Sequence, residues 1–385
     1  MIQFPLSFVA LSFVFSVKYT SLSTKSCFNV TMSFLNICRE FICNFVYYYA
    51  LVLGVATVRV DLQPIRWELA LNKIVRISRS ILNIIMIITA PIVIWKTMNL
   101  LHTSITNPLV MLVDTVQSYL QVSTFIGTIL FYWLKENPLL ELANRFGFLD
   151  GQFYVYSEKN EKLERFVSIA LLNKFLCLFG QAFCAIYGLN ILLNGFTWST
   201  AFMAIYIAHM QNLIHGSMFY YYGLLIQVHK RFLMINEKIQ SLLQSLEQVP
   251  SVYQSNSLHY LFNMISEDLR AIMLQHYHLT ELTHGINTAY QYQNLVVLIT
   301  YLTTNIGYGY NVVLVLDGSM NIGFTALSVI FGIVAYTGLF LDLYLFFWCC
   351  HITCGESYRT SWLLRRFSEL KFQHAELEKI VRIIE

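Results

Sequence analysis

The sequence is dominated by apolar stretches, each about as long as a helix that crosses a bilayer. Roughly 20 apolar residues span the hydrocarbon core, because a helix rises about 1.5 Å per residue. Six stretches reach this length, at residues 81–101, 109–134, 166–193, 196–228, 290–316 and 322–350. Because no water satisfies backbone polar groups in lipid, each stretch is expected to be helical. The sequence therefore predicts an all-α integral membrane protein with six transmembrane helices.

A seventh apolar stretch, at residues 41–58, is shorter and is interrupted by Asn44. It is expected either to span the membrane or to lie in the interface. Charged residues make up only 12% of the chain, about half the share of a soluble domain. The net charge of +3 gives no reason to expect a nucleic-acid partner.

Lys and Arg alternate between the connections, which indicates the orientation of the chain. Five lie in residues 59–79, five in 135–165, four in 229–289 and six after 350. The short connections at 102–108, 194–195 and 317–321 hold none. By the positive-inside rule, the long basic segments are cytosolic and the short ones are outside. The N-terminus is then also cytosolic, provided that residues 41–58 do not span.

The cytosolic segments themselves show helical periodicity. Apolar residues recur at three- and four-residue steps in two runs. The first run is Phe232, Ile235, Ile239, Leu242, Leu243 and Leu246, and the second is Leu258, Leu261, Ile265, Leu269, Ile272 and Leu279. The fourth span is thus expected to continue into the cytosol and the fifth to begin there. Their apolar faces predict helix pairing beneath the membrane, within or between subunits.

No set of residues points to catalysis, a cofactor or a metal. His209 and His215 are six residues apart and therefore face different sides of one helix. The eight cysteines have no metal-ligand spacing, and we interpret them as reduced thiols, with palmitoylation as the alternative for the cluster at Cys349, Cys350 and Cys354. The chain is therefore not expected to be an enzyme.

Ionisable residues inside a membrane are candidates for function. Asp114 lies about 9 Å below the outer end of the second span, where a carboxylate suits a cationic ligand or an internal partner. Lys174 is expected to be structural, with its ammonium extended toward the inner interface. Asp342 is expected to join a gate or an inner polar network.

Aromatic residues gather in the outer halves of several spans. They are Tyr187, Trp198, Tyr206, Tyr308 and Tyr310. Such residues form either an interfacial belt or a pocket for small, mostly apolar ligands. Together with Asp114, they are the candidate ligand-binding residues. Tyr220, Tyr221 and Tyr222 lie nearer the inner face and are expected to be packing residues.

Several segments together resemble the insect gustatory receptor family over residues 41–385. They are Tyr47-Tyr48-Tyr49-Ala50-Leu51-Val52-Leu53-Gly54 before Asp61, Asn107-Pro108-Leu109, Phe367-Ser368-Glu369-Leu370 and Glu376-Leu377-Glu378. The resemblance implies a subunit of a tetrameric, ligand-gated cation channel in the plasma membrane of a sensory dendrite. It also implies small-molecule tastants, bitter ones for divergent members, and homo- or heteromeric partners. The family's seventh-span motif, Thr-Tyr followed by Gln-Phe, is absent.

This resemblance divides the chain into an N-terminal segment at 1–40, a receptor domain at 41–350 and a cytosolic tail at 351–385. Because the family's seventh span lines the pore, the chain alone is expected not to conduct. Two alternatives remain open. A G-protein-coupled receptor requires residues 41–58 to span, but Asp-Arg-Tyr and Asn-Pro-x-x-Tyr motifs are missing. A small transporter would show paired broken helices, which the sequence does not suggest.

Overall fold

The computed structural model describes residues 58–60, 69–71, 73–102, 107–135, 161–192, 197–247, 255–317 and 326–369. It also describes residues 137–139, 141–142, 144–146 and 149. The expectations for residues 1–57 and for the tail beyond residue 369 lie outside these ranges. The apolar stretch at 41–58, apart from its last residue, is therefore untested by the structure.

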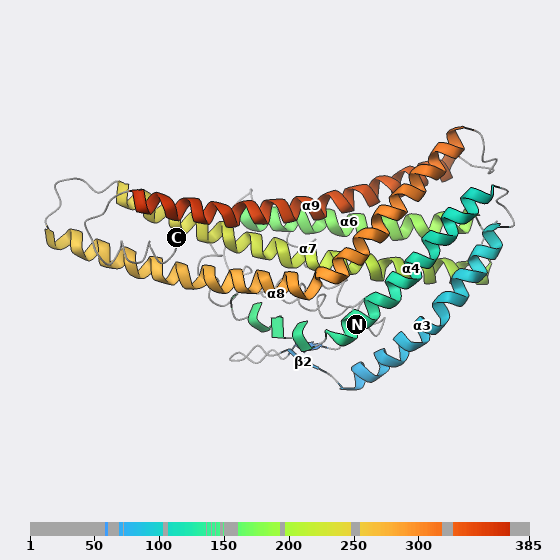
Figure 1. The fold of residues 1–385 in the computed structure, drawn as a ribbon, viewed down its shortest axis with the longest axis horizontal. Helices are drawn as coiled ribbons and strands as arrows, with labels where there is room; N and C mark the ends of the chain where they lie inside the picture. Colours follow the sequence, from blue (N-terminus) through green and yellow to red (C-terminus); the bar gives the residue numbers. More distant parts are fainter. Residues whose placement is uncertain are drawn as a thin grey trace, which may run out of the picture.

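Long helices running roughly side by side make up most of the described chain (Figure 1). They are α3 (Lys73–His102), α4 (Pro108–Leu134), α6 (Glu161–Leu192), α7 (Trp198–Glu247), α8 (Ser255–Leu316) and α9 (Ala326–Glu369). The helices α6, α7 and α9 pack closely on one another, while α3 and α4 lie together at one end. At that end lie the C-terminal ends of α3 and α8 and the N-terminal ends of α4 and α9, and it is the side predicted to face outward (Figure 1).

Local sequence explains where two of these helices begin. Asn107 caps α4, since its Oδ1 accepts a hydrogen bond from the Leu109 amide at 3.0 Å, and Pro108 occupies the first helical turn. At the start of α7, the Thr200 amide donates to Thr197 Oγ1 at 3.2 Å. The Thr197 amide in turn donates to Thr200 Oγ1 at 2.9 Å, so the two residues form a reciprocal cap.

The expected continuation of the fourth and fifth spans beyond the membrane is seen in the structure. Along their axes, the 50 residues of α7 measure about 75 Å and the 62 residues of α8, which bends midway (Figure 1), about 93 Å. A bilayer core needs only about 30 Å of this length. All six apolar residues of the α7 run are buried, and so are Ile265, Leu269, Ile272 and Leu279 of the α8 run. Within this single chain, α7 therefore packs against α8 beneath the predicted membrane.

Polar contacts join the same inner ends. Asn236 of α7 donates to the Glu356 carbonyl of α9 at 2.9 Å and accepts from the Thr360 hydroxyl at 2.8 Å. Lys238 of α7 pairs with Asp268 of α8 at 3.0 Å. Because α9 continues to Glu369, it joins this inner bundle, where Phe367 is buried. The predicted end of the sixth span at residue 350 is thus the middle of one continuous helix.

Four of the described helices have the length and hydropathy of a membrane span. These segments are Ser80–Leu100, Pro108–Leu134, Lys162–Cys184 and Ile330–Phe367. They correspond to four of the six predicted spans. The other two predicted spans lie on α7 and α8, whose outer parts carry many Tyr, Asn and Gln residues that lower the mean hydropathy. The count of six therefore stays a prediction.

The structure also contains a feature that the all-α prediction omits. Strands β1 (Val58–Val60) and β2 (Leu69–Leu71) pair antiparallel, with Arg59 opposite Ala70. Val58 and Val60 favour extended backbone because they are β-branched. Such short strands fall below the length at which a periodic pattern becomes recognisable.

Candidate functional site

An ion pair between α6 and α9 lies in the interior of the helix bundle. Lys174 Nζ is 2.6 Å from Asp342 Oδ1, and the two side chains are only 1% and 3% exposed. The same ammonium donates to the Asp342 carbonyl at 3.1 Å and lies 5.5 Å from the centre of the Tyr222 ring. Two desolvated charges persist together because each compensates the other.

Two further helices contribute to this pair. The Tyr301 hydroxyl of α8 donates to Asp342 Oδ2, and His215 Nδ1 of α7 contacts the same hydroxyl. The four residues Lys174, His215, Tyr301 and Asp342, which we call the buried network, therefore connect α6, α7, α8 and α9. A charged group between four helices fixes their relative register, because sliding any helix would leave a buried polar atom unpaired.

The expectation for Lys174 was partly wrong. Its ammonium does not extend to the interface but is buried against Asp342. The physical reason is that the Asp342 carboxylate on a neighbouring helix lies within reach and compensates the charge of the ammonium, so the ammonium does not have to be hydrated. The expectation that Asp342 joins a polar network is confirmed.

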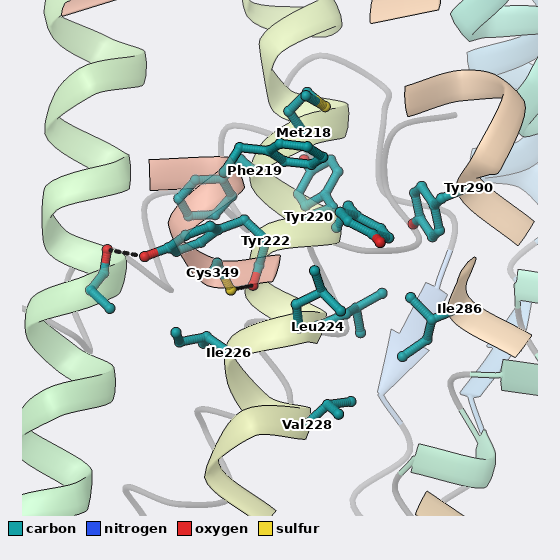
Figure 2. Packing of buried hydrophobic residues seen from close by; sticks show 14 of the residues in the cluster. Met218, Phe219, Tyr220, Tyr222, Leu224, Ile226, Val228, Ile286, Tyr290 and Cys349 are labelled. Carbon is teal, nitrogen blue, oxygen red and sulfur yellow. Dashed lines mark hydrogen bonds between the residues drawn. The ribbon is translucent and has the colours of Figure 1, made fainter. Parts of the chain in front are cut away.

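The inner side of this network is closed by apolar and aromatic packing. Figure 2 shows Tyr222 on one side of α7, directed at α6, and Ile286 and Tyr290 of α8 on the other side. The Tyr222 hydroxyl donates to the Ala170 carbonyl at 3.3 Å. Tyr220, Tyr221 and Tyr222 are all buried, as expected for packing residues.

On the side predicted to face outward, which we call the outer side, Tyr308 of α8 interacts with residues of α4 and α6. Asp114 of α4 and Cys184 of α6 both interact electrostatically with the Tyr308 hydroxyl. The helices α4 and α8 approach closely here, since a Cβ added at Gly307 would be 2.5 Å from Gln117 Oε1. The carboxylate of Asp114 and the thiol of Cys184 thus lie within electrostatic range of the Tyr308 hydroxyl.

Along α6 and α8, between the levels of this group and of the buried network, lie two amide side chains with atoms that have no hydrogen-bond partner among the described residues. Gln181 of α6 is 9% exposed, and neither its Nε2 nor its Oε1 is paired. It faces Gly338 of α9, where an added Cβ would be 3.4 Å from Gln181 Cγ. Asn305 of α8 donates to the Tyr301 carbonyl at 2.9 Å, but its Oδ1 is unpaired. By helical rise, Asp114, Gln181, Asn305, Tyr308 and Gly338 all lie on the same side of the buried network, and we call these five residues the outer site.

The outer site includes two of the six predicted ligand-binding residues, Asp114 and Tyr308. Tyr187 packs on Phe331 with ring centres 4.1 Å apart, which joins α6 to α9 further out. Tyr310 is two residues from Tyr308, and therefore projects from nearly the opposite face of α8.

The structure does not bring the other two together with these residues. The Tyr206 hydroxyl donates to the Met86 carbonyl and contacts Thr89 Oγ1, both at 2.8 Å, so it joins α7 to α3. Trp198, at the first turn of α7, is 96% exposed. Its exposure agrees with the interfacial alternative considered for these aromatics.

Sequence reasoning missed Gln181, Asn305, Tyr301 and His215. A neutral amide inside an apolar stretch is not selected when the sequence is searched for charged or aromatic residues. One signal was available: Lys174 and Gln181 are seven residues apart, so they share one face of α6. That face was identifiable as polar before the structure was known.

The comparisons with known proteins agree with a receptor of this kind. The family model described as 7tm Chemosensory receptor matches residues 43–383, which is most of the chain. The search of curated proteins found no match.

Proposed function

Because the chain belongs to the 7tm chemosensory receptor family, we propose that it detects small extracellular molecules as a gustatory receptor subunit. In this proposal the subunit acts in a tetrameric, ligand-gated cation channel, alone or with related subunits. Its ligands are bitter compounds, and it resides in the plasma membrane of sensory dendrites with a cytosolic N-terminus. The family membership and the membrane-spanning character of the helices support this function.

The observation that carries the ligand proposal is the group formed by Asp114 and Tyr308 in the outer half of the bundle. Asp114 supplies a half-buried negative charge within a predicted span, and its attraction to an amine is stronger there than in water. The Tyr308 ring supplies an aromatic face to a ligand cation or an apolar ring. We therefore expect ligands that combine an aromatic or aliphatic body with a basic nitrogen.

The test compares a cationic and a neutral probe of the same size. Benzylamine and benzyl alcohol are applied to voltage-clamped cells expressing the chain together with family subunits that conduct. Asp114→Asn should weaken the response to benzylamine and leave that to benzyl alcohol almost unchanged. Asp317→Asn, at the exposed outer end of α8, is the matched control. Equal loss for both probes would mean that Asp114 has a structural role.

A further inference from the structure

Gln181 is the least explained polar side chain in the described bundle. Its side chain is nine-tenths buried, yet both amide atoms lack a hydrogen-bond partner among the described residues. A buried amide without partners is unfavourable, because it lost water on folding and gained nothing in return. Such groups are rare in native proteins, where a buried amide is normally bound by protein, by an ordered water or by another molecule.

The contrast with Gln293 shows that this bundle does satisfy amides elsewhere. Gln293 of α8 is similarly buried, at 4% exposure, and its Nε2 donates to Thr128 Oγ1 at 2.7 Å. The Ser217 hydroxyl lies 3.4 Å from the same nitrogen. Gln181 has no such neighbours, and it faces the bare backbone of Gly338 instead of a polar side chain.

A second unpaired acceptor lies at a comparable depth. Asn305 Oδ1 is about 6 Å outward of Tyr301 along α8, while Gln181 is about 10 Å outward of Lys174 along α6. Tyr301 and Lys174 meet at the same carboxylate, so both amides lie on the outward side of one point in the bundle.

We propose that the Gln181 amide binds a neutral carboxamide-like group of the ligand, accepting one hydrogen bond from it and donating another. A glutamine side chain presents an acceptor and a donor in one plane, which is the complement of a carboxamide. The buried network just inward is already neutralised by its own ion pair and adds no net charge. Gln181 would thus bind a neutral polar group of the ligand, whereas Asp114 would bind a cationic group further outward. This inference rests on the proposed function, because it assumes that the outer site takes a small molecule.

The first test needs no ligand. The full chain is purified in nanodiscs, and its thermal unfolding is compared with that of Gln181→Leu and Gln293→Leu. If Gln181 is reserved for a ligand, leucine removes an unpaired amide and raises the midpoint temperature. Gln293→Leu should lower it, because Thr128 and Ser217 lose their partner. A lower midpoint for both variants would overturn the inference and make Gln181 a structural residue.

The second test uses benzamide and benzylamine as probes, with the midpoint temperature measured across a concentration series. Benzamide should bind roughly tenfold more weakly to Gln181→Leu than to the unaltered protein, as expected for the loss of about 1.4 kcal/mol of hydrogen bonding. Benzylamine should bind both proteins equally. Undiminished benzamide binding by Gln181→Leu would overturn the inference alone. Failure of both probes to shift the unaltered protein would overturn the proposed function as well.

Discussion

Removing one charge of the buried network should destabilise the protein far more than removing a charge on its surface. The perturbation is Lys174→Met, which fits an unbranched apolar side chain into the space of the lysine stem. Asp342 then keeps the Tyr301 hydroxyl as a donor but loses the ammonium at 2.6 Å. Its side chain is only 3% exposed, so water does not replace the lost partner.

The expected loss follows from this burial. Breaking a buried ion pair by removing one partner costs about 3–5 kcal/mol, because an uncompensated charge stays in the interior. Replacing both charges at once, in Lys174→Met with Asp342→Asn, removes the uncompensated charge and should recover most of that loss. The asparagine still accepts a hydrogen bond from Tyr301, so α8 and α9 remain joined.

Thermal and denaturant unfolding of the purified chain in nanodiscs measures these changes, and a double-mutant cycle isolates the coupling. The surface control is Arg145→Met, since Arg145 pairs with Glu281 where both side chains are about half exposed. That variant should lose little. The reasoning fails if Lys174→Met loses no more than the Arg145 variant, or if the losses of the two network substitutions simply add.

Three further predictions concern other contacts. Tyr206→Phe should lower stability by roughly 1–3 kcal/mol in unfolding assays, because the Met86 carbonyl loses its phenolic donor; an unchanged midpoint would show that the hydroxyl is dispensable. Gly307→Ala should turn the Gln117 side chain aside and leave α4 in place, because the atom nearest to the added Cβ, Gln117 Oε1 at 2.5 Å, is the end of a flexible side chain; a lower disulfide cross-linking yield between α4 and α8 in this variant would show instead that the helices had separated. Burial lowers the pKa of His276 on the inner extension of α8 below its ordinary 6.5. The unfolded chain therefore binds a proton more readily than the folded one, and stability should fall as the pH drops below about 6.5. His276→Gln should flatten that fall, and an equally steep fall in the variant would assign it to another group.

The parts of the fold that could be predicted from the sequence are those governed by long repeats. The apolar residues from Phe232 to Leu246 recur over four turns, so their common face and its burial were evident without a structure. The same holds for the helix start at Asn107, where cap and proline act locally. The helix that packs on this face, α8, was not predictable, because the periodicity of α7 indicates that its apolar face is buried but does not identify the element that covers it.

The candidate site was predictable where it carries a charge or, at Tyr308, an aromatic ring in the outer half of a span. Asp114 and Asp342 stood out because an acid in an apolar stretch is costly. The pairing of Lys174 with Asp342 joins residues 168 positions apart, and no local pattern encodes a contact over that distance. Gln181 was missed for a different reason. It stands out because its buried amide has no hydrogen-bond partner among the described residues, and this is visible only in the folded structure.

The unbroken course of α7 has a mechanical consequence. This helix, about 75 Å long, begins at Trp198 on the side predicted to face outward and ends at Glu247 among the inner helices. A tilt of about 5° around its outer end would displace the inner end by roughly 6 Å, with no change of secondary structure. A molecule that tilts α7 slightly from its outer end would therefore move the inner end by a larger distance. Asn236 and Lys238 lie near that inner end, where they contact α9 and α8.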